Sequence, residues 1–110
     1  MPQKMPGGWW EATPEEARDH FASHPDARII DVREPAEFAA GHVEGAVLHP
    51  LDDVLDNPEG IPGVGHDEDV WLYCRSGRRS GVAAADLAKK GYTRVHNFQG
   101  VMQWPFGLVR

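Results

Sequence analysis

The 110-residue sequence contains only one cysteine, Cys74, and this scarcity excludes several kinds of site. A lone cysteine cannot form an internal disulfide, a Cys-x-x-Cys redox pair or a structural zinc site built on several thiolates. The sequence also lacks an apolar run of membrane-spanning length, and residues 1–8 lack the apolar stretch of a signal peptide. We therefore expect a soluble protein without a membrane partner, cytoplasmic by default. A mature periplasmic protein stripped of its signal peptide would look the same.

A surplus of positive charge is absent as well, because the formal net charge is −6 at pH 7. This balance argues against nucleic acid or an anionic membrane as the main partner. Against the acidic background, Arg75, Arg78 and Arg79 lie within five positions of one another. We expect them to bind a small anionic substrate locally rather than to form part of a basic surface.

The length and the 41% hydrophobic content predict one globular domain with a modest core. Residues 1–8 include two prolines and two glycines, so we expect a flexible amino-terminal segment there. A single domain is expected over residues 9–110, since the sequence contains no internal repeat and no low-complexity tract.

The stretch of residues 69–80 organises the rest of the chain. It begins with a short apolar run of β-branched and aromatic residues, which predicts a buried strand, and it continues into a six-residue loop that opens with Cys74. Residues 81–90 then predict a helix. Backbone N–H groups and the helix dipole favour an anion at such a loop, so Cys74 is expected to be a thiolate and a candidate nucleophile. The alternative is an inert buried thiol. We favour it less because three arginines lie close to Cys74 in the sequence, and positive charge favours a reactive thiolate.

Strands and helices are expected to alternate along the chain. Thr13 is the predicted cap of a helix that begins at Pro14, with Glu16 completing a capping box, and the helix should end before Pro25. Further strands are expected at 9–12, 27–33, 46–48 and 93–98, and further helices at 34–40 and 51–55. This alternation predicts an α/β domain with a parallel sheet, in which ligands bind beyond the carboxyl ends of the strands.

We interpret the other polar residues as structural or solvent-exposed rather than as part of a catalytic or metal site. His20 and His24 have a helical metal-binding spacing, but the zincin pattern needs Glu where Phe21 stands, so we assign no metal and no cofactor. The acidic loop 56–69 has no EF-hand spacing and is expected to be a solvated connection. Asp31 and Arg33 either belong to a site or, the favoured interpretation, form a structural network with Glu37 or His42. The remaining histidines are also interpreted as structural.

The chain resembles a single-domain rhodanese. The resemblance rests on three blocks that occur in the order typical of that family: residues 29–46 (IIDVREPAEFAAGHVEGA), residues 74–79 (CRSGRR), and residues 97–100 (NFQG) followed by Trp104. It implies a five-stranded parallel sheet flanked by helices on both faces. It further implies that Cys74 accepts sulfur as a persulfide, with Arg75, Ser76, Gly77, Arg78 and Arg79 completing the substrate-binding loop. One departure is Gln99, which precedes Gly100 where the family often has a Gly-Gly pair.

This resemblance predicts a sulfurtransferase that moves sulfane sulfur from thiosulfate, or a similar donor, to cyanide or a thiol acceptor, which could be a protein. One alternative is a non-enzymatic module that carries sulfur or binds a partner. Another is a phosphatase or arsenate reductase of the same fold. Those enzymes place an arginine after Cys and five residues, which would be position 80, and this chain has Ser80 there.

Overall fold

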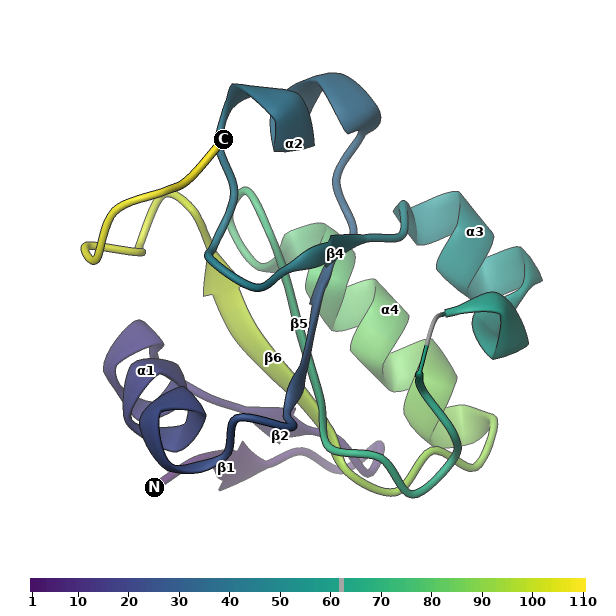
Figure 1. Ribbon diagram of the computed structural model, residues 1–110. Helices are drawn as coiled ribbons and strands as arrows, with labels where there is room; N and C mark the ends of the chain where they lie inside the picture. Colours follow the sequence, from purple (N-terminus) through teal and green to yellow (C-terminus); the bar gives the residue numbers. More distant parts are fainter. Residues whose placement is uncertain (62) are drawn as a thin grey trace.

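The structure is a computed structural model that describes residues 1–61 and 63–110. The predicted loop 56–69 includes Pro62, which lies outside the described residues. The chain forms one sheet with strands in the order β1-β2-β6-β5-β3-β4, flanked by helices (Figure 1). The strands are β1 (Gln3–Lys4), β2 (Trp10–Glu11), β3 (Arg28–Asp31), β4 (Val47–Leu48), β5 (Val70–Cys74) and β6 (Val95–Gly100). The helices are α1 (Pro14–Ser23), α2 (Pro35–Ala40), α3 (Leu51–Asp56), the 3-10 turn η1 (Pro58–Gly60) and α4 (Arg78–Lys89).

The sheet contains the five parallel strands that the resemblance implied, from β2 through β4. It also has a sixth strand, because β1 pairs antiparallel with β2 and places Gln3 opposite Glu11. The amino-terminal segment that composition indicated to be flexible thus supplies an edge strand. Pro6, Gly7 and Gly8 lie in the turn between β1 and β2, where Gly8 has a φ of +98° and its N–H donates to the Met5 carbonyl.

The sheet is covered by α3 and α4 on one face and by α1 on the other, while α2 lies near the carboxyl ends of the strands (Figure 1). Helix α1 begins as predicted: Thr13 and Glu16 form both hydrogen bonds of the capping box, and the helix ends before Pro25. In the described part of the chain, no helix is long and apolar enough to cross a membrane.

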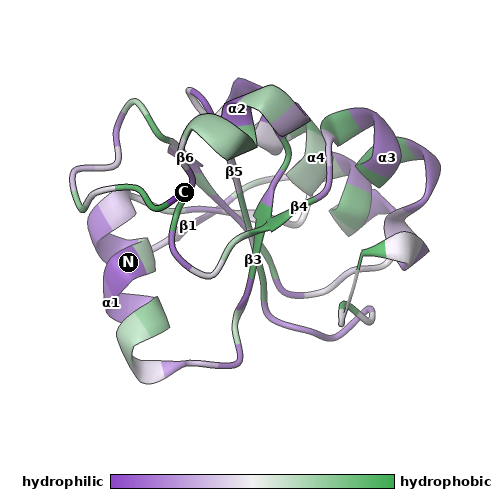
Figure 2. Ribbon diagram, turned by 45° about the horizontal axis from the view of Figure 1, so that its top comes forward, coloured by the Kyte–Doolittle hydropathy of each residue, from purple (hydrophilic) through white to green (hydrophobic). Residues whose placement is uncertain are grey.

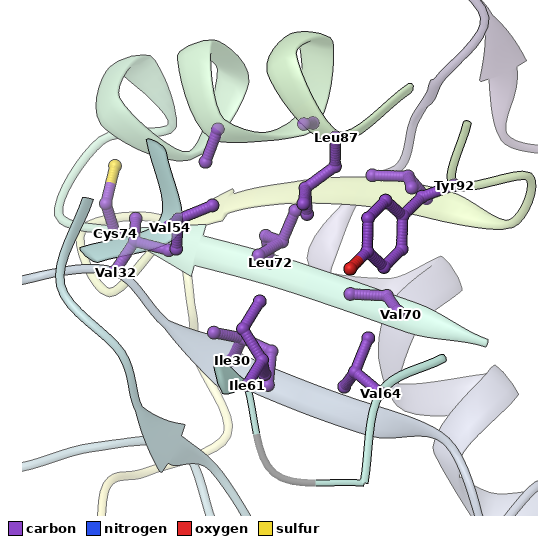
Figure 3. Packing of buried hydrophobic residues seen from close by; sticks show 13 residues of the cluster. Ile30, Val32, Val54, Ile61, Val64, Val70, Leu72, Cys74, Leu87 and Tyr92 are labelled. Atoms are coloured by element: carbon purple, nitrogen blue, oxygen red, sulfur yellow. The ribbon is translucent and has the colours of Figure 1, made fainter. Parts of the chain in front are cut away.

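Strand β5 is the centre of the core, and all five of its residues are buried. Because side chains alternate along a strand, Leu72 and Cys74 face α4, whereas Trp71 and Tyr73 face the α1 side. Figure 3 shows Leu87 of α4 packed toward Leu72, with the sulfur of Cys74 at one end of this cluster. Figure 2 shows β3 and β4 coloured as largely hydrophobic, whereas much of α1 is hydrophilic.

Helix α4 begins at Arg78, three residues earlier than the sequence predicted. The cause is Gly77, whose φ of +100° turns the chain directly from the loop into the helix. The buried face of the helix is made by Ser80, Ala83, Ala84 and Leu87. Val82 of the same helix is 50% exposed and lies outside this buried face. Small buried residues let α4 lie close to the sheet and bring its first turn against Cys74.

Candidate active site

The candidate nucleophile lies at the carboxyl end of the parallel sheet. Cys74 is the last residue of β5 and is 1% exposed. Only Arg75, Ser76 and Gly77 separate it from α4, so the predicted six-residue loop is three residues of loop followed by the first turn of a helix.

Strand β6 packs against this loop through Gly100. A Cβ atom at Gly100 would lie 2.2 Å from the backbone carbonyl of Arg75, so only glycine allows this approach. The preceding residue, Gln99, has a φ of +75°, a conformation that non-glycine residues rarely adopt and that costs on the order of 1 kcal/mol. The departure at Gln99 therefore leaves the close contact in place, because Gly100 makes it.

Hydrogen-bond donors surround the thiol. The N–H of Gly77 donates to Cys74 Sγ at 3.1 Å, and the Ser80 hydroxyl lies 3.4 Å from the same atom. Burial raises the pKa of the Cys74 thiol, but hydrogen bonds from the Ser80 hydroxyl and from the N–H groups of Ser80, Gly77 and Ser76 lower it, and the net direction is downward. This arrangement favours the thiolate form, which is the nucleophilic form of cysteine.

Sequence analysis missed the residues behind Ser80. The Ser80 hydroxyl donates to Asn97 Oδ1 at 2.7 Å, and Asn97 Nδ2 donates to both carboxylate oxygens of Glu11 at 3.1 and 3.2 Å. Asn97 is on β6 and Glu11 on β2, so these contacts join distant parts of the chain. The one signal available in the sequence was that buried polar residues such as Asn97 need partners.

The three arginines of the loop have different environments. Arg79 makes a bidentate ion pair with Glu37 of α2: its Nη1 and Nη2 donate to Oε1 and Oε2 at 2.8 and 3.0 Å. Hydrogen bonding to Arg79 lowers the pKa of Glu37 to about 2. Arg75 and Arg78 are exposed, and among the described residues no carboxylate lies within ion-pair distance of either. Two of the three guanidinium groups therefore have no ion-pair partner among the described residues, whereas the third is held by Glu37.

Asp31 and Arg33 form the structural network that the favoured interpretation expected, but with different partners. Arg33 pairs with Asp31 itself at 2.7 Å and also donates to the Gly41 carbonyl at 2.7 Å. Both side chains are buried. Glu37 is already paired with Arg79, and the His42 ring stacks on Phe38, so neither completes this network.

His20 and His24 lie near the opposite end of β5 from Cys74. His20 Nε2 contacts the buried carboxylate of Asp69 at 2.5 Å, and the His24 ring stacks on His20 with a centroid distance of 3.9 Å. Within residues 1–61 and 63–110, no group of three or more His, Cys, Asp or Glu side chains is placed to hold a metal ion.

A cavity of about 390 Å³ lies between α1 and the carboxyl-terminal segment, lined mainly by apolar residues that include Phe21, Trp104 and Leu108. Neither Cys74 nor its loop lines this cavity, so it is separate from the candidate active site.

Comparison with known proteins identifies the family. The profile of the rhodanese-like domain matches residues 13–104. This chain belongs to the rhodanese-like domain family.

Named relatives of this rhodanese-like domain include sulfurtransferases. A sulfurtransferase of Allochromatium vinosum is 37% identical over 95 residues, which cover 86% of each chain. The thiosulfate sulfurtransferase PspE of Escherichia coli is 38% identical over 73 residues, 66% of this chain and 68% of PspE. The chain spans only 60% of its Bacillus subtilis relative YqhL and 24% of MoeZ of Mycobacterium tuberculosis, a probable adenylyltransferase/sulfurtransferase.

Solved structures show the same fold. The human single-domain sulfurtransferase TSTD1 superposes with a TM-score of 0.77 at 24% identity, covering 86% of this chain and 93% of TSTD1. A rhodanese from E. coli solved with anions superposes with a TM-score of 0.67 at 34% identity, covering 76% of this chain and 98% of its own. The profile match and the superpositions agree on the rhodanese fold.

Proposed function

We propose that this rhodanese-like domain transfers sulfane sulfur from thiosulfate, or a similar donor, to cyanide or a thiol acceptor through a persulfide on Cys74. The observation that carries the proposal is the position of Cys74 Sγ, which lies at the carboxyl end of β5 within 3.1 Å of the Gly77 N–H and 3.4 Å of the Ser80 hydroxyl. Relatives named as sulfurtransferases, including one named for thiosulfate, support it.

The first half-reaction forms the persulfide. The Cys74 thiolate attacks the outer sulfur of thiosulfate, the S–S bond of the donor breaks, and sulfite leaves with the electron pair of that bond. The transferred sulfur keeps the negative charge that it carried in thiosulfate, and the charge of the thiolate leaves with sulfite, so Cys74 becomes a persulfide anion. The hydrogen bonds to Cys74 lower the pKa of its thiol, so the mechanism assigns no separate general base.

The second half-reaction regenerates the thiolate. A cyanide ion or an acceptor thiolate attacks the outer sulfur, and the electron pair of the Cys74 persulfide bond returns to Sγ. The products are thiocyanate or an acceptor persulfide. No oxidant or reductant is needed, since each half-reaction exchanges one nucleophile for another at the same sulfur atom.

The arginines bind the donor in this mechanism. Arg75 and Arg78 are exposed and have guanidinium groups without an ion-pair partner among the described residues, so they are available for the sulfonate oxygens of thiosulfate. Arg79 contributes positive charge near the sulfur, but Glu37 holds its side chain and offsets that charge.

Intact-mass measurement tests the proposal. Native protein and Cys74→Ser are incubated with thiosulfate and freed of excess donor, and their intact masses are measured by mass spectrometry. Cyanide is then added and the masses are measured again. We expect only the native protein to gain the mass of one sulfur atom and to lose it to cyanide as thiocyanate. Failure of the native protein to gain this mass would rule out thiosulfate as the donor. Hydrolysis of an aryl phosphate that depends on Cys74 would instead favour the phosphatase alternative.

A further inference from the structure

The side-chain amide of Asn97 has only one orientation that satisfies its neighbours. Both carboxylate oxygens of Glu11 and the carbonyl of Gly77, which lies 3.1 Å from Asn97 Nδ2, can only accept hydrogen bonds. The amide nitrogen must therefore face them. Its oxygen then faces the Ser80 hydroxyl at 2.7 Å and the N–H of Gln99 at 3.3 Å, which can both donate.

The Ser80 hydroxyl consequently has one proton and several acceptors within reach. Asn97 Oδ1 lies at 2.7 Å, while Cys74 Sγ and the carbonyl oxygen of Gln99 each lie at 3.4 Å. Ser80 is fully buried, so water does not compete for this proton. Of the three acceptors, only Sγ changes its charge during sulfur transfer.

We propose that Ser80, oriented by Asn97 and Glu11, is a positioning residue that stabilises the Cys74 thiolate as the leaving group of the second half-reaction. When Sγ is a thiolate, the Ser80 proton is directed to it. When Cys74 carries the transferred sulfur, the negative charge lies one atom farther out, Sγ becomes a weak neutral acceptor, and the proton returns to Asn97 Oδ1. The leaving-group role rests on the proposed function.

The consequence is an asymmetry between the two half-reactions. As the acceptor attacks the outer sulfur, the S–S bond breaks and its electron pair moves to Sγ. Ser80 then donates to charge that is developing, and such an interaction is stronger in the transition state than in the persulfide. In the first half-reaction the same hydrogen bond is present before attack and weakens during it. Loss of Ser80 should thus slow sulfur release more than sulfur capture.

Besides Arg75 and Arg78, charged groups stand on the elements packed around this loop. They are Arg79 on α4 with its partner Glu37 on α2, the buried Asp31 and Arg33 pair at the end of β3, and Glu11 behind Asn97. A Ser80 variant leaves all of these charges in place. Its effect on the thiolate can therefore be assigned to the hydroxyl.

The test combines alkylation with half-reaction kinetics. The rate at which iodoacetamide modifies Cys74 is measured against pH for the native protein, Ser80→Ala and Ser80→Thr, with Ser23→Ala, an exposed serine of α1, as the matched control. We expect the Ser80→Ala profile to move to higher pH and its alkylation rate at pH 7 to fall by about threefold to tenfold. Release of sulfur from its persulfide to cyanide should slow by about tenfold, and capture from thiosulfate by less.

The variants also separate this role from a structural one. Ser80→Thr keeps the hydroxyl and should recover most of the native profile, and Ser23→Ala should match the native protein. An unchanged alkylation profile in Ser80→Ala, or equal slowing of capture and release, would overturn the proposal. Alkylation requires no sulfur donor. If the native protein fails to form a persulfide, the proposed function fails, and the alkylation comparison still decides whether Ser80 stabilises the thiolate.

Discussion

The two ends of β5 both gather polar and titratable side chains, but they differ in how these groups are paired. At the amino end, the Asp69 carboxylate accepts from His20 and from Trp71 Nε1, at 2.5 and 2.9 Å, and His96 stacks on Trp71. At the carboxyl end, Cys74 faces N–H and hydroxyl donors, and two arginines nearby have no ion-pair partner in the described chain.

The difference supports the proposal that the carboxyl-end cluster is the functional site. Burial raises the pKa of Asp69, but the hydrogen bonds from His20 and Trp71 lower it by more than burial raises it, so the net direction is downward. The Asp69 carboxylate thus has its hydrogen-bond partners within the chain. At the other end, the Gly77 N–H and the Ser80 hydroxyl face Cys74 Sγ, and the exposed Arg75 and Arg78 have no ion-pair partner among the described residues. A matched cluster stabilises the fold, whereas a cluster with surplus donors is prepared for an anion that the chain does not supply.

The carboxyl end should be most sensitive to a change at Gly100. In Gly100→Ala the new methyl group would overlap the backbone of Arg75, so either the loop moves or the fold weakens by about 3 kcal/mol. We expect sulfur transfer to fall to near background and chemical denaturation to show the loss of stability. Gly65→Ala, where a Cβ meets only Glu68 Cγ at 3.9 Å, is the control. Native activity in Gly100→Ala would show that the close contact is dispensable.

The amino end should show the converse pattern. Asp69→Asn leaves one of the two donors, His20 or Trp71, facing an amide N–H, and it should lower the free energy of unfolding by about 1–3 kcal/mol. Because Asp69 precedes the strand that Cys74 ends, sulfur transfer by the folded fraction should stay native. Thermal and urea unfolding measure the first effect, with the exposed Asp26→Asn as control. A selective loss of activity would contradict the division between the two ends.

The unpaired arginines should give a smaller effect, confined to donor binding. Arg75→Ala and Arg78→Ala should each raise the KM for thiosulfate by about threefold to tenfold, because an exposed guanidinium that binds an oxyanion contributes modestly. Stability should change little, since neither side chain has an ion-pair partner among the described residues. Arg28→Ala, at the amino end of β3, removes the same charge far from the thiol and is the control. Equal effects in all three would indicate only a long-range charge effect.

How much of this contrast could be predicted depends on the range of the interactions. The strand, loop and helix around Cys74 and the capping box of α1 are local patterns, and the sequence predicted them. The start of α4 was missed because it depends on the left-handed Gly77, and β1 because an edge strand of two residues forms only when β2 is there to pair with it. The contacts behind Ser80 and the ion pair of Arg79 join residues 17 to 86 positions apart. No periodicity encodes such pairs.

The smallest expected effect is a pH dependence at the edge of the carboxyl-end cluster. The ion pair with Arg79 lowers the pKa of Glu37 from 4.5 to about 2, and a depressed carboxyl pKa stabilises the fold above the pKa of the unfolded state. This contribution should be complete at neutral pH and should disappear as the pH falls through about 4 toward 2. Because Glu37 is 32% exposed and screened by solvent, Glu37→Gln should cost less than about 1 kcal/mol at pH 7.

Urea unfolding of the native protein and of Glu37→Gln at pH 7 and near pH 2 measures this difference. The two proteins should differ at pH 7 and nearly converge near pH 2, where Glu37 is protonated in the unfolded state and about half protonated in the folded state. Glu34→Gln, which removes an exposed carboxylate from the same helix start, is the control and should show no such convergence. If the difference in free energy of unfolding between the native protein and Glu37→Gln persists near pH 2, Glu37 acts through packing. Arg79 would then have no fixed partner, and all three loop arginines would be free to bind the donor.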